Sequence, residues 1–196
     1  MNKETRKRKP RPLSFDRDEA VNIAMRLFWR HGYEGVSVSE LTEAIGIAPP
    51  SLYAAFGNKV GLFREALDRY AETSQTMSAL VATGSLEEAM EVLLNQAIEE
   101  ATRSETERGC MMSTALSQCG LNHQEIGAEL RQRRKAMRDQ IAEVFSRWLP
   151  LPEAEELALY LTTIMQGFSV QIRDGASKDQ MRRIAQRALA GVAAVQ

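Results

Sequence analysis

Apolar positions recur along this chain with the spacing of amphipathic helices. After Asp16 they fall at i, i+3, i+4, i+7 and i+8, which is the order of a stripe along one helix face: Ala20, Ile23, Ala24, Leu27 and Phe28. No segment alternates strictly between apolar and polar residues, as a half-buried strand would. The pattern therefore predicts an all-α protein of about nine helices without a sheet.

Capping residues and helix breakers divide this pattern into segments. Asp16 can cap a first helix that ends near His31, and Ser85 and Ser177 can cap later ones. Gly57-Asn58 and Thr83-Gly84-Ser85 are typical of breaks or linkers, and Pro150 ends a long helix. Beyond the first helix and a helix-turn-helix, we expect helices after Ser85 and over about 59–80, 109–119, 123–149, 152–175 and 177–195.

Residues 36–63 have the pattern of a helix-turn-helix. Ser37 can cap a short helix that carries one apolar face, and Gly46 follows it directly. Glycine tolerates the positive φ that a tight exit from a helix requires. The second helix starts with Pro49 and Pro50, which the first turn of a helix accepts because their missing N–H groups would have no partner there. Two short helices joined in this way can place the second one in a DNA major groove.

The same stretch carries a family resemblance. The pattern Leu52-Tyr53-x-x-Phe56-x-x-Lys59, preceded by Gly46 and by the block Leu27-Phe28 to His31-Gly32-Tyr33, resembles the DNA-binding domain of the TetR family of bacterial repressors. The resemblance spans about residues 17–68. It implies an all-helical homodimer with a larger C-terminal domain for ligand and dimer contacts. We accordingly divide the chain into a basic disordered arm (1–14), a three-helix helix-turn-helix domain (15–58), a bridging helix (59–82) and a helical ligand-binding and dimerisation domain (83–196).

The resemblance also implies which residues contact DNA. Tyr53 can donate its hydroxyl to a phosphate, and Lys59 can add a charge-assisted contact. Between Ile47 and Gly57 there is no Arg, Asn or Gln, so the bidentate pairings that discriminate guanine or adenine are absent, and specificity is expected to depend on DNA shape. An ordinary packed tyrosine is the alternative for Tyr53. The predicted DNA-contacting residues are Ser37, Ala48, Pro49, Pro50, Ser51, Tyr53, Ala54 and Lys59.

Charge is distributed unevenly along the chain. Residues 1–12 carry six basic side chains against Glu4 alone, although the 196 residues together have a formal net charge of −1. A basic arm beside a DNA-reading domain suits a polyanion, while a merely solvated arm is the alternative.

No apolar run approaches a membrane span, no secretory signal follows the basic start, and two cysteines fit a reducing compartment. We expect a cytoplasmic protein with double-stranded DNA as its partner and without a cofactor.

The C-terminal part gives weaker signals for a small-molecule effector. The run from Arg108 to Met112, Arg-Gly-Cys-Met-Met, resembles a run in some TetR-type regulators without fixing a ligand. Methionines line adaptable pockets well, with plain core as the alternative. Arg134, in register with an apolar stripe, can clamp a ligand carboxylate, extend into water or pair with a glutamate. The predicted effector residues are Met111, Met112, Leu116, Cys119, Arg134, Met137 and Ile141.

The last two predicted helices carry long apolar stripes, which either form core or pair with a second copy of the chain. The resemblance implies a four-helix bundle with two helices from each subunit. Two recognition helices related by a two-fold axis predict an inverted-repeat operator and an affinity that falls steeply with salt. The predicted dimer-interface residues are Leu157, Leu161, Ile164, Met165, Phe168, Ile184, Ala188 and Val192.

Three other functions remain to be weighed. Cys110 and Cys119 suggest thiol-based redox or electrophile sensing; on one continuous helix they would lie about 13 Å apart, too far for a disulfide, but a single reactive thiol stays open. A metal site is not expected because His123 is the only nearby imidazole, and an enzyme is disfavoured because no catalytic or phosphate-loop motif occurs. A helical protein-binding adaptor is the alternative from another class. We predict a ligand-released homodimeric repressor.

Overall fold

The computed structural model describes residues 15–114 and 124–193, and these ranges contain ten helices and no strand. The all-α class is thus confirmed. The basic arm, Leu116, Cys119 and His123 lie outside the described residues. The helices are α1 (Arg17–His31), α2 (Val38–Ile45), α3 (Pro49–Phe56), α4 (Lys59–Thr73), α5 (Thr76–Val81), α6 (Leu86–Ala101), α7 (Met111–Thr114), α8 (Gln124–Phe145), α9 (Leu151–Arg173) and α10 (Lys178–Ala193).

The local signals for the first three helices are confirmed. Asp16 caps α1 by accepting hydrogen bonds from the main-chain N–H groups of Asp18 and Glu19. Ser37 and Glu40 form a reciprocal capping box at the start of α2, and Gly46 ends that helix with φ of 76°. These contacts join neighbours in sequence, which is why the sequence alone predicts them.

The helix expected over 59–80 is interrupted, which accounts for the additional helix. α4 ends at Thr73 and α5 starts at Thr76. At the break, Glu100 of α6 accepts hydrogen bonds from Ser74 Oγ at 2.8 Å, from the Gln75 N–H at 3.2 Å and from Thr76 Oγ1 at 3.1 Å. One carboxylate therefore accepts a main-chain N–H and two hydroxyl groups at the break. Since Glu100 lies more than twenty positions away, no local pattern indicates this break.

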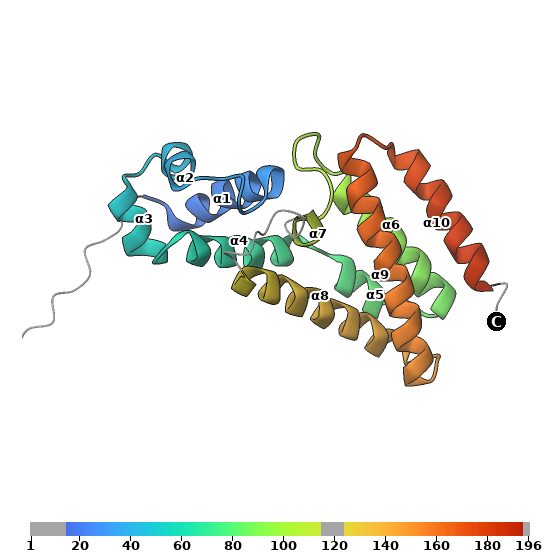
Figure 1. The fold of residues 1–196 in the computed structure, drawn as a ribbon. Coiled ribbons are helices and arrows are strands. Elements are labelled where there is room, and N and C mark those ends of the chain that lie inside the picture. Colours follow the sequence, from blue (N-terminus) through green and yellow to red (C-terminus); the bar gives the residue numbers. More distant parts are fainter. Residues whose placement is uncertain (1–14, 115–123, 194–196) are drawn as a thin grey trace, which may run out of the picture.

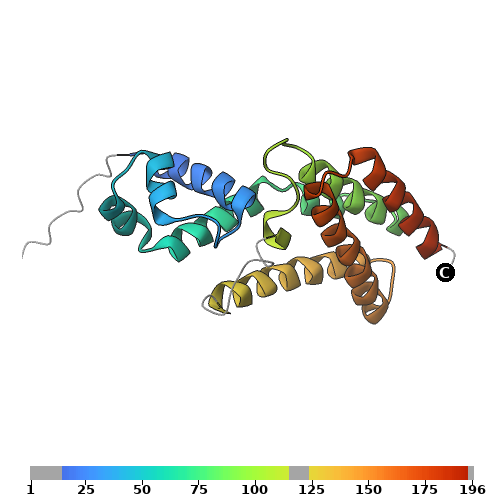
Figure 2. The same ribbon diagram turned by 45° about the horizontal axis from the view of Figure 1, so that its top comes forward.

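Buried side chains form two clusters. The first joins α1 to α4 with the start of α7 and the first half of α8, and Phe28 and Phe63 meet edge to face in it at 5.0 Å. The second joins α5, α6, α9, α10 and the second half of α8. Figure 1 shows α2 and α3 at one end of the molecule and α10 at the other, and Figure 2 shows the same order after rotation. α4 and α8 lie between these ends.

Ion pairs tie α4 to α8 along this middle part. Arg64 Nε lies 2.7 Å from Glu129 Oε2, and Arg133 Nη1 lies 2.7 Å from Asp68 Oδ1. α4, which we expected to bridge two domains, buries its apolar face in the first cluster, and these ion pairs join it to α8 as well. The boundaries at residues 58 and 82 stay a prediction. Within the described residues no helix is long and apolar enough to cross a membrane.

Candidate nucleic-acid interface and effector cavity

The second helix of the helix-turn-helix, α3, is anchored on one side and open on the other. Leu52 and Phe56 are buried in the first cluster, and the Arg17 guanidinium lies 4.9 Å from the centre of the Phe56 ring. Tyr53 is 49% exposed, so it is not the packed tyrosine of the alternative interpretation. The other predicted contact residues on α3 and its N-cap are exposed, except for half-buried Ser51: Ala48, Pro49, Pro50 and Ala54.

The start of α2 is less open to phosphate than the sequence indicates. Ser37 N–H donates to Glu40 Oε2 at 2.7 Å, and Glu40 N–H donates to Ser37 Oγ at 3.1 Å. The main-chain hydrogen bond from Ser37, followed by the one from its side chain, lowers the pKa of Glu40. A carboxylate of this chain therefore already occupies the helix start.

Lys59 is held against an aromatic ring at the start of α4. Its Nζ lies 4.2 Å from the centre of the Tyr33 ring, which fixes the ammonium group by a cation–π contact. Burial lowers the pKa of Lys59, while the charges of Glu34 and Glu40 oppose this shift. The predicted phosphate contact thus comes from a positioned rather than a freely moving side chain.

A cavity of about 90 Å³ lies beside the break between α4 and α5. Its wall includes the methionines Met77, Met112, Met137 and Met165, together with Tyr70 and Cys110. Of the predicted effector residues, Met112 and Met137 line this cavity. Met165, predicted at the dimer interface, lines it as well. A mainly apolar wall with a few polar groups is typical of small-molecule sites, and methionine side chains can widen such a space by changing rotamer.

The remaining effector predictions have different places. Met111 and Ile141 are fully buried, one in each cluster, and do not line the cavity. Arg134 is 8% exposed, and its Nη1 donates to the main-chain carbonyl of Met112 at 2.9 Å. Arg134 therefore holds the backbone beside the cavity, and its contact with a ligand stays a prediction. Burial lowers the pKa of Arg134.

Polar groups of the cavity wall surround Cys110. The Cys110 N–H donates to Ser169 Oγ at 2.6 Å. Burial, and secondarily the neighbouring Cys110 thiol, raises the pKa of Tyr70 well above its ordinary value, so its hydroxyl is protonated at neutral pH. Within 15–114 and 124–193, no group of three or more His, Cys, Asp or Glu side chains is placed to hold a metal ion.

The predicted dimer-interface residues divide between core and surface. Leu161 and Phe168 are buried inside the chain and Ala188 is nearly so, which leaves them little surface for contact with a second copy. Ile184 is 42% exposed, while the others are half-buried: Leu157, Ile164, Met165 and Val192. Four exposed apolar side chains of α9 were not among the predicted residues: Leu151, Leu159, Tyr160 and Val170. A helical stripe shows that a face is apolar but not which neighbour covers it.

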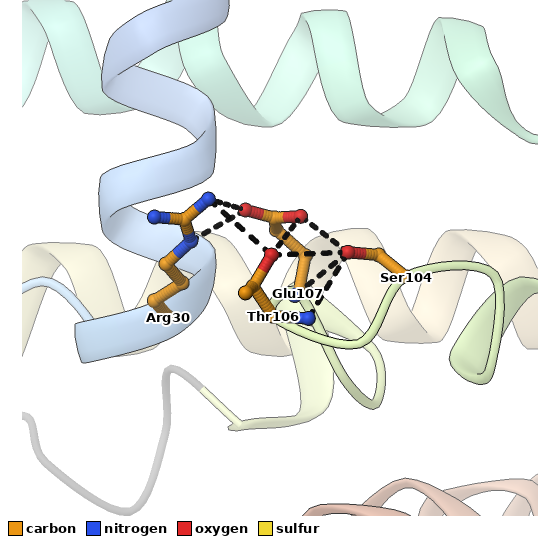
Figure 3. Close-up of polar contacts among 4 residues, drawn as sticks. All are labelled: Arg30, Ser104, Thr106 and Glu107. Carbon is orange, nitrogen blue, oxygen red and sulfur yellow. Dashed lines mark hydrogen bonds and ion pairs between the residues drawn. The ribbon is translucent and has the colours of Figure 1, made fainter.

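The C-terminal end of α1 contacts the segment before α7 (Figure 3). Glu107 forms an ion pair with Arg30 and accepts hydrogen bonds from Ser104 Oγ at 2.6 Å and Thr106 Oγ1 at 2.9 Å. Trp29 Nε1 donates to the Gly109 carbonyl at 2.9 Å. Sequence analysis missed this junction, since its partners are 77 to 80 positions apart.

Arg173 at the end of α9 adds to the junction. Its Nη1 donates to the Trp29 carbonyl at 3.2 Å, and its Nη2 donates to the Arg30 carbonyl at 2.8 Å. These two carbonyls belong to the last turn of α1, where acceptors lack helical partners. Helix α1 is therefore held at its end by residues of the C-terminal half of the chain.

A second helix with one buried face and an exposed face that carries Tyr53 is the arrangement of a DNA-binding helix-turn-helix. Residues 21–66 match the profile described as bacterial regulatory proteins, tetR family. The chain is 34% identical over 190 residues to the HTH-type transcriptional repressor ComR of Escherichia coli K12, covering 92% of this chain and 90% of that protein. The chain belongs to the TetR family and is a transcriptional repressor, not an enzyme.

Two further comparisons agree with this assignment. The HTH-type transcriptional repressor BdcR of the same E. coli strain is 31% identical over 185 residues, covering 93% of this chain and 91% of that protein. A solved structure of the TetR family regulator CifR, a triple cysteine mutant in complex with 26-bp double-strand operator DNA, is 34% identical with a TM-score of 0.84. It covers 92% of this chain and 98% of that one.

Proposed function

We propose that the chain acts as a homodimer that binds a palindromic operator through α3 and releases it when a small molecule enters the cavity beside Cys110. The observation that carries the DNA part is the placement of Tyr53, Pro49, Pro50 and Ala54 on the exposed side of α3 while Leu52 and Phe56 anchor its other side. The solved operator-DNA complex of the CifR variant, at 34% identity, supports double-stranded DNA as the partner.

Recognition would combine phosphate contacts with shape. Tyr53 and Ser51 supply hydroxyl donors, and Lys59 supplies a charge at the end of the same surface. Pro49, Pro50 and Ala54 offer apolar contacts to thymine methyl groups. α3 has no Arg, Asn or Gln that could form two hydrogen bonds to one base edge. We therefore expect sequence-dependent DNA deformability to contribute to the choice of operator.

Dimerisation would use the outer faces of α9 and α10. Leu159, Tyr160, Val170 and Ile184 are large apolar side chains exposed on these two helices. A groove of about 450 Å³ lies between the start of α9 and the end of α10, with Leu157 and Val192 in its wall. A second copy related by a two-fold axis would cover these apolar groups and place two α3 helices on one face of the DNA.

The effector signal would pass through the segment that walls the cavity. Cys110 and Met112 line the cavity, whereas Glu107 and Gly109, a few residues before them, hold the end of α1. A ligand that displaces Cys110 or Met112 would therefore also shift the partners of α1. Such coupling requires that the ligand bind more tightly to the shifted state than to the DNA-binding state.

A gel-shift titration against the DNA upstream of the chain's own gene tests the DNA part. We expect retention of a specific fragment over random competitor and a steep loss of affinity with salt. Lys59→Gln should weaken binding and reduce the salt slope by about one. Lys135→Gln is the matched control because Lys135 is exposed on α8 and pairs with Asp139. Equal binding to specific and random DNA would refute the proposal.

Covalent sensing at Cys110 is a second candidate for the effector step, and its place in the cavity wall is the observation that favours it. An electrophile would form a bond to Sγ while the thiol proton is lost. Cys110→Ser should then abolish DNA release by such a compound, and Cys119→Ser should not. If Cys110→Ser protein still responds to the inducer, covalent sensing at Cys110 is excluded.

A further inference from the structure

A pocket of about 160 Å³, separate from the cavity beside Cys110 and from the groove between α9 and α10, lies at the junction of α1, the segment before α7 and the end of α9. Its wall consists of Trp29, Arg30, Thr106, Arg108 and Arg173. Three arginines therefore face one small space. None of the five residues lines the effector cavity or belongs to the exposed side of α3.

Arg108 is held in this wall by uncharged acceptors. Its Nε donates to the Ile172 carbonyl at 2.9 Å, and its Nη2 donates to the Ala176 carbonyl at 3.1 Å. The carboxylate nearest to its Nη1 is that of Glu105, at 3.7 Å, and the Glu105 side chain is 96% exposed. The guanidinium is thus fixed in direction, while its charge is left largely uncompensated.

Arg173 is held in the same way by the Trp29 and Arg30 carbonyls at the end of α1. Among the described residues, no carboxylate lies within ion-pair distance of Arg173. Arg30 differs because Glu107 pairs with it and is itself held by Ser104 and Thr106. Two of the three guanidinium groups are therefore oriented by main-chain carbonyls and keep their positive charge for another partner.

We infer that this pocket binds a small oxyanion, either inorganic phosphate or the phosphate or carboxylate group of a metabolite. Guanidinium groups fixed in direction bind tetrahedral and planar oxyanions because their N–H donors match the spacing of the oxygens. A volume near 160 Å³ is about five times the share of one water molecule in the liquid, enough for one such group. The single negative charge of Glu107 beside Arg30 limits the affinity, which we expect to be millimolar.

An operator phosphate does not fit this position. Arg17 at the start of α1 lies within 3.5 Å of the Ala55 carbonyl of α3, whereas the pocket adjoins the opposite end of the same helix. The 15 residues of α1 separate these ends by about 22 Å. Figure 1 places α3 at one end of the molecule and the segment before α7 near its middle. The pocket is therefore separate from the proposed DNA-contacting residues and from the cavity beside Cys110.

Thermal unfolding in phosphate, sulfate, acetate and chloride at equal ionic strength and pH tests this site. Phosphate and sulfate also stabilise proteins without binding, so the comparison that matters is between variants. At an anion concentration ten times the dissociation constant, binding at this site should stabilise the wild type. Its unfolding midpoint should then rise by about 3–6 °C more than the midpoint of a variant that lacks the site. Arg108→Gln should lose this increment, and Arg103→Gln, an exposed arginine of the same segment, should keep it.

Arg173→Lys is the second variant, for use if Arg108→Gln fails to fold by circular dichroism. Lysine keeps the positive charge but lacks the paired N–H donors of the guanidinium group. This variant should therefore weaken phosphate binding several-fold in phosphorus NMR titrations. A response to phosphate but not acetate identifies a phosphate group as the ligand, and a response to both identifies oxyanions generally. If wild type, Arg108→Gln and Arg103→Gln are stabilised equally, the anion effect is nonspecific and the inference is overturned.

Discussion

Replacing Glu107 by glutamine is the sharpest test of the junction between α1 and the segment that walls the effector cavity. The carboxylate accepts hydrogen bonds from Arg30, Ser104 and Thr106, and its side chain is 11% exposed. Glutamine keeps the shape of the side chain and one acceptor oxygen but loses the negative charge. Its amide NH₂ group would then face the donors of Arg30, Ser104 and Thr106. The change therefore removes the ion pair without opening a cavity.

The size of the effect follows from these contacts. A hydrogen bond to a charged group contributes about 1.5–3 kcal/mol when it is buried. The Arg30 side chain is 38% exposed, so solvent screens its share of the pair and moves the contribution to around the lower end of that range. We expect Glu107→Gln to cost about 1–2 kcal/mol, which lowers the unfolding midpoint by roughly 2–8 °C for a chain of this size. Glu105→Gln, at an exposed position of the same segment, should change it little.

The pH dependence gives an independent check. Burial raises the pKa of Glu107, but hydrogen bonds from Ser104, Thr106 and Arg30 outweigh it, so the folded-state pKa lies below the ordinary value. A lowered folded-state pKa means that the stabilisation is present above the unfolded pKa of about 4.3 and is lost as the pH falls through the folded pKa. The difference between wild type and Glu107→Gln should therefore shrink on acidification. Equal melting of both glutamine variants, or a difference that grows at low pH, would refute this reasoning.

Three other substitutions test the remaining parts of the structure. Leu52→Ala removes a fully buried side chain beneath α3 and should cost about 2–5 kcal/mol in chemical unfolding, with loss of operator binding; a change under 1 kcal/mol would contradict its place in the core. Ile184→Glu should convert dimers to monomers in sedimentation velocity, whereas Val81→Glu, at an exposed position on α5, should not; dimers in both variants would contradict the place of Ile184 in the interface. Ser37→Ala removes half of the capping box and should cost about 1 kcal/mol in thermal unfolding, and an unchanged midpoint would show that the cap contributes nothing.

Some features needed only neighbouring residues and were predictable. Asp16, Ser37 and Gly46 act on main-chain groups within four positions of themselves, so their roles are evident in the order of residues. The buried side of α3 was predictable as well, since Leu52 and Phe56 share one helix face. These local signals, together with the family resemblance, gave the helix-turn-helix and the residues placed on its outer surface.

Other features depended on partners that the order of residues does not reveal. Arg134 stands in an apolar register, yet its partner is the carbonyl of Met112, 22 positions earlier. Leu161 and Ile184 both belong to apolar stripes, but neighbouring helices bury only the first. The break between α4 and α5 exists because Glu100 reaches it from α6.

By itself, the sequence determined the helical class, the start and end of the first helices, and the family of DNA-binding proteins to which the chain belongs. Hydrogen bonds and side-chain preferences within one or two helical turns are sufficient for those features. Only the tertiary structure decided which methionines enclose a cavity, which apolar face stays open and how Arg30, Glu107 and Arg173 meet. Those outcomes depend on how whole helices pack against each other, because packing brings together groups that lie up to 144 positions apart along the chain.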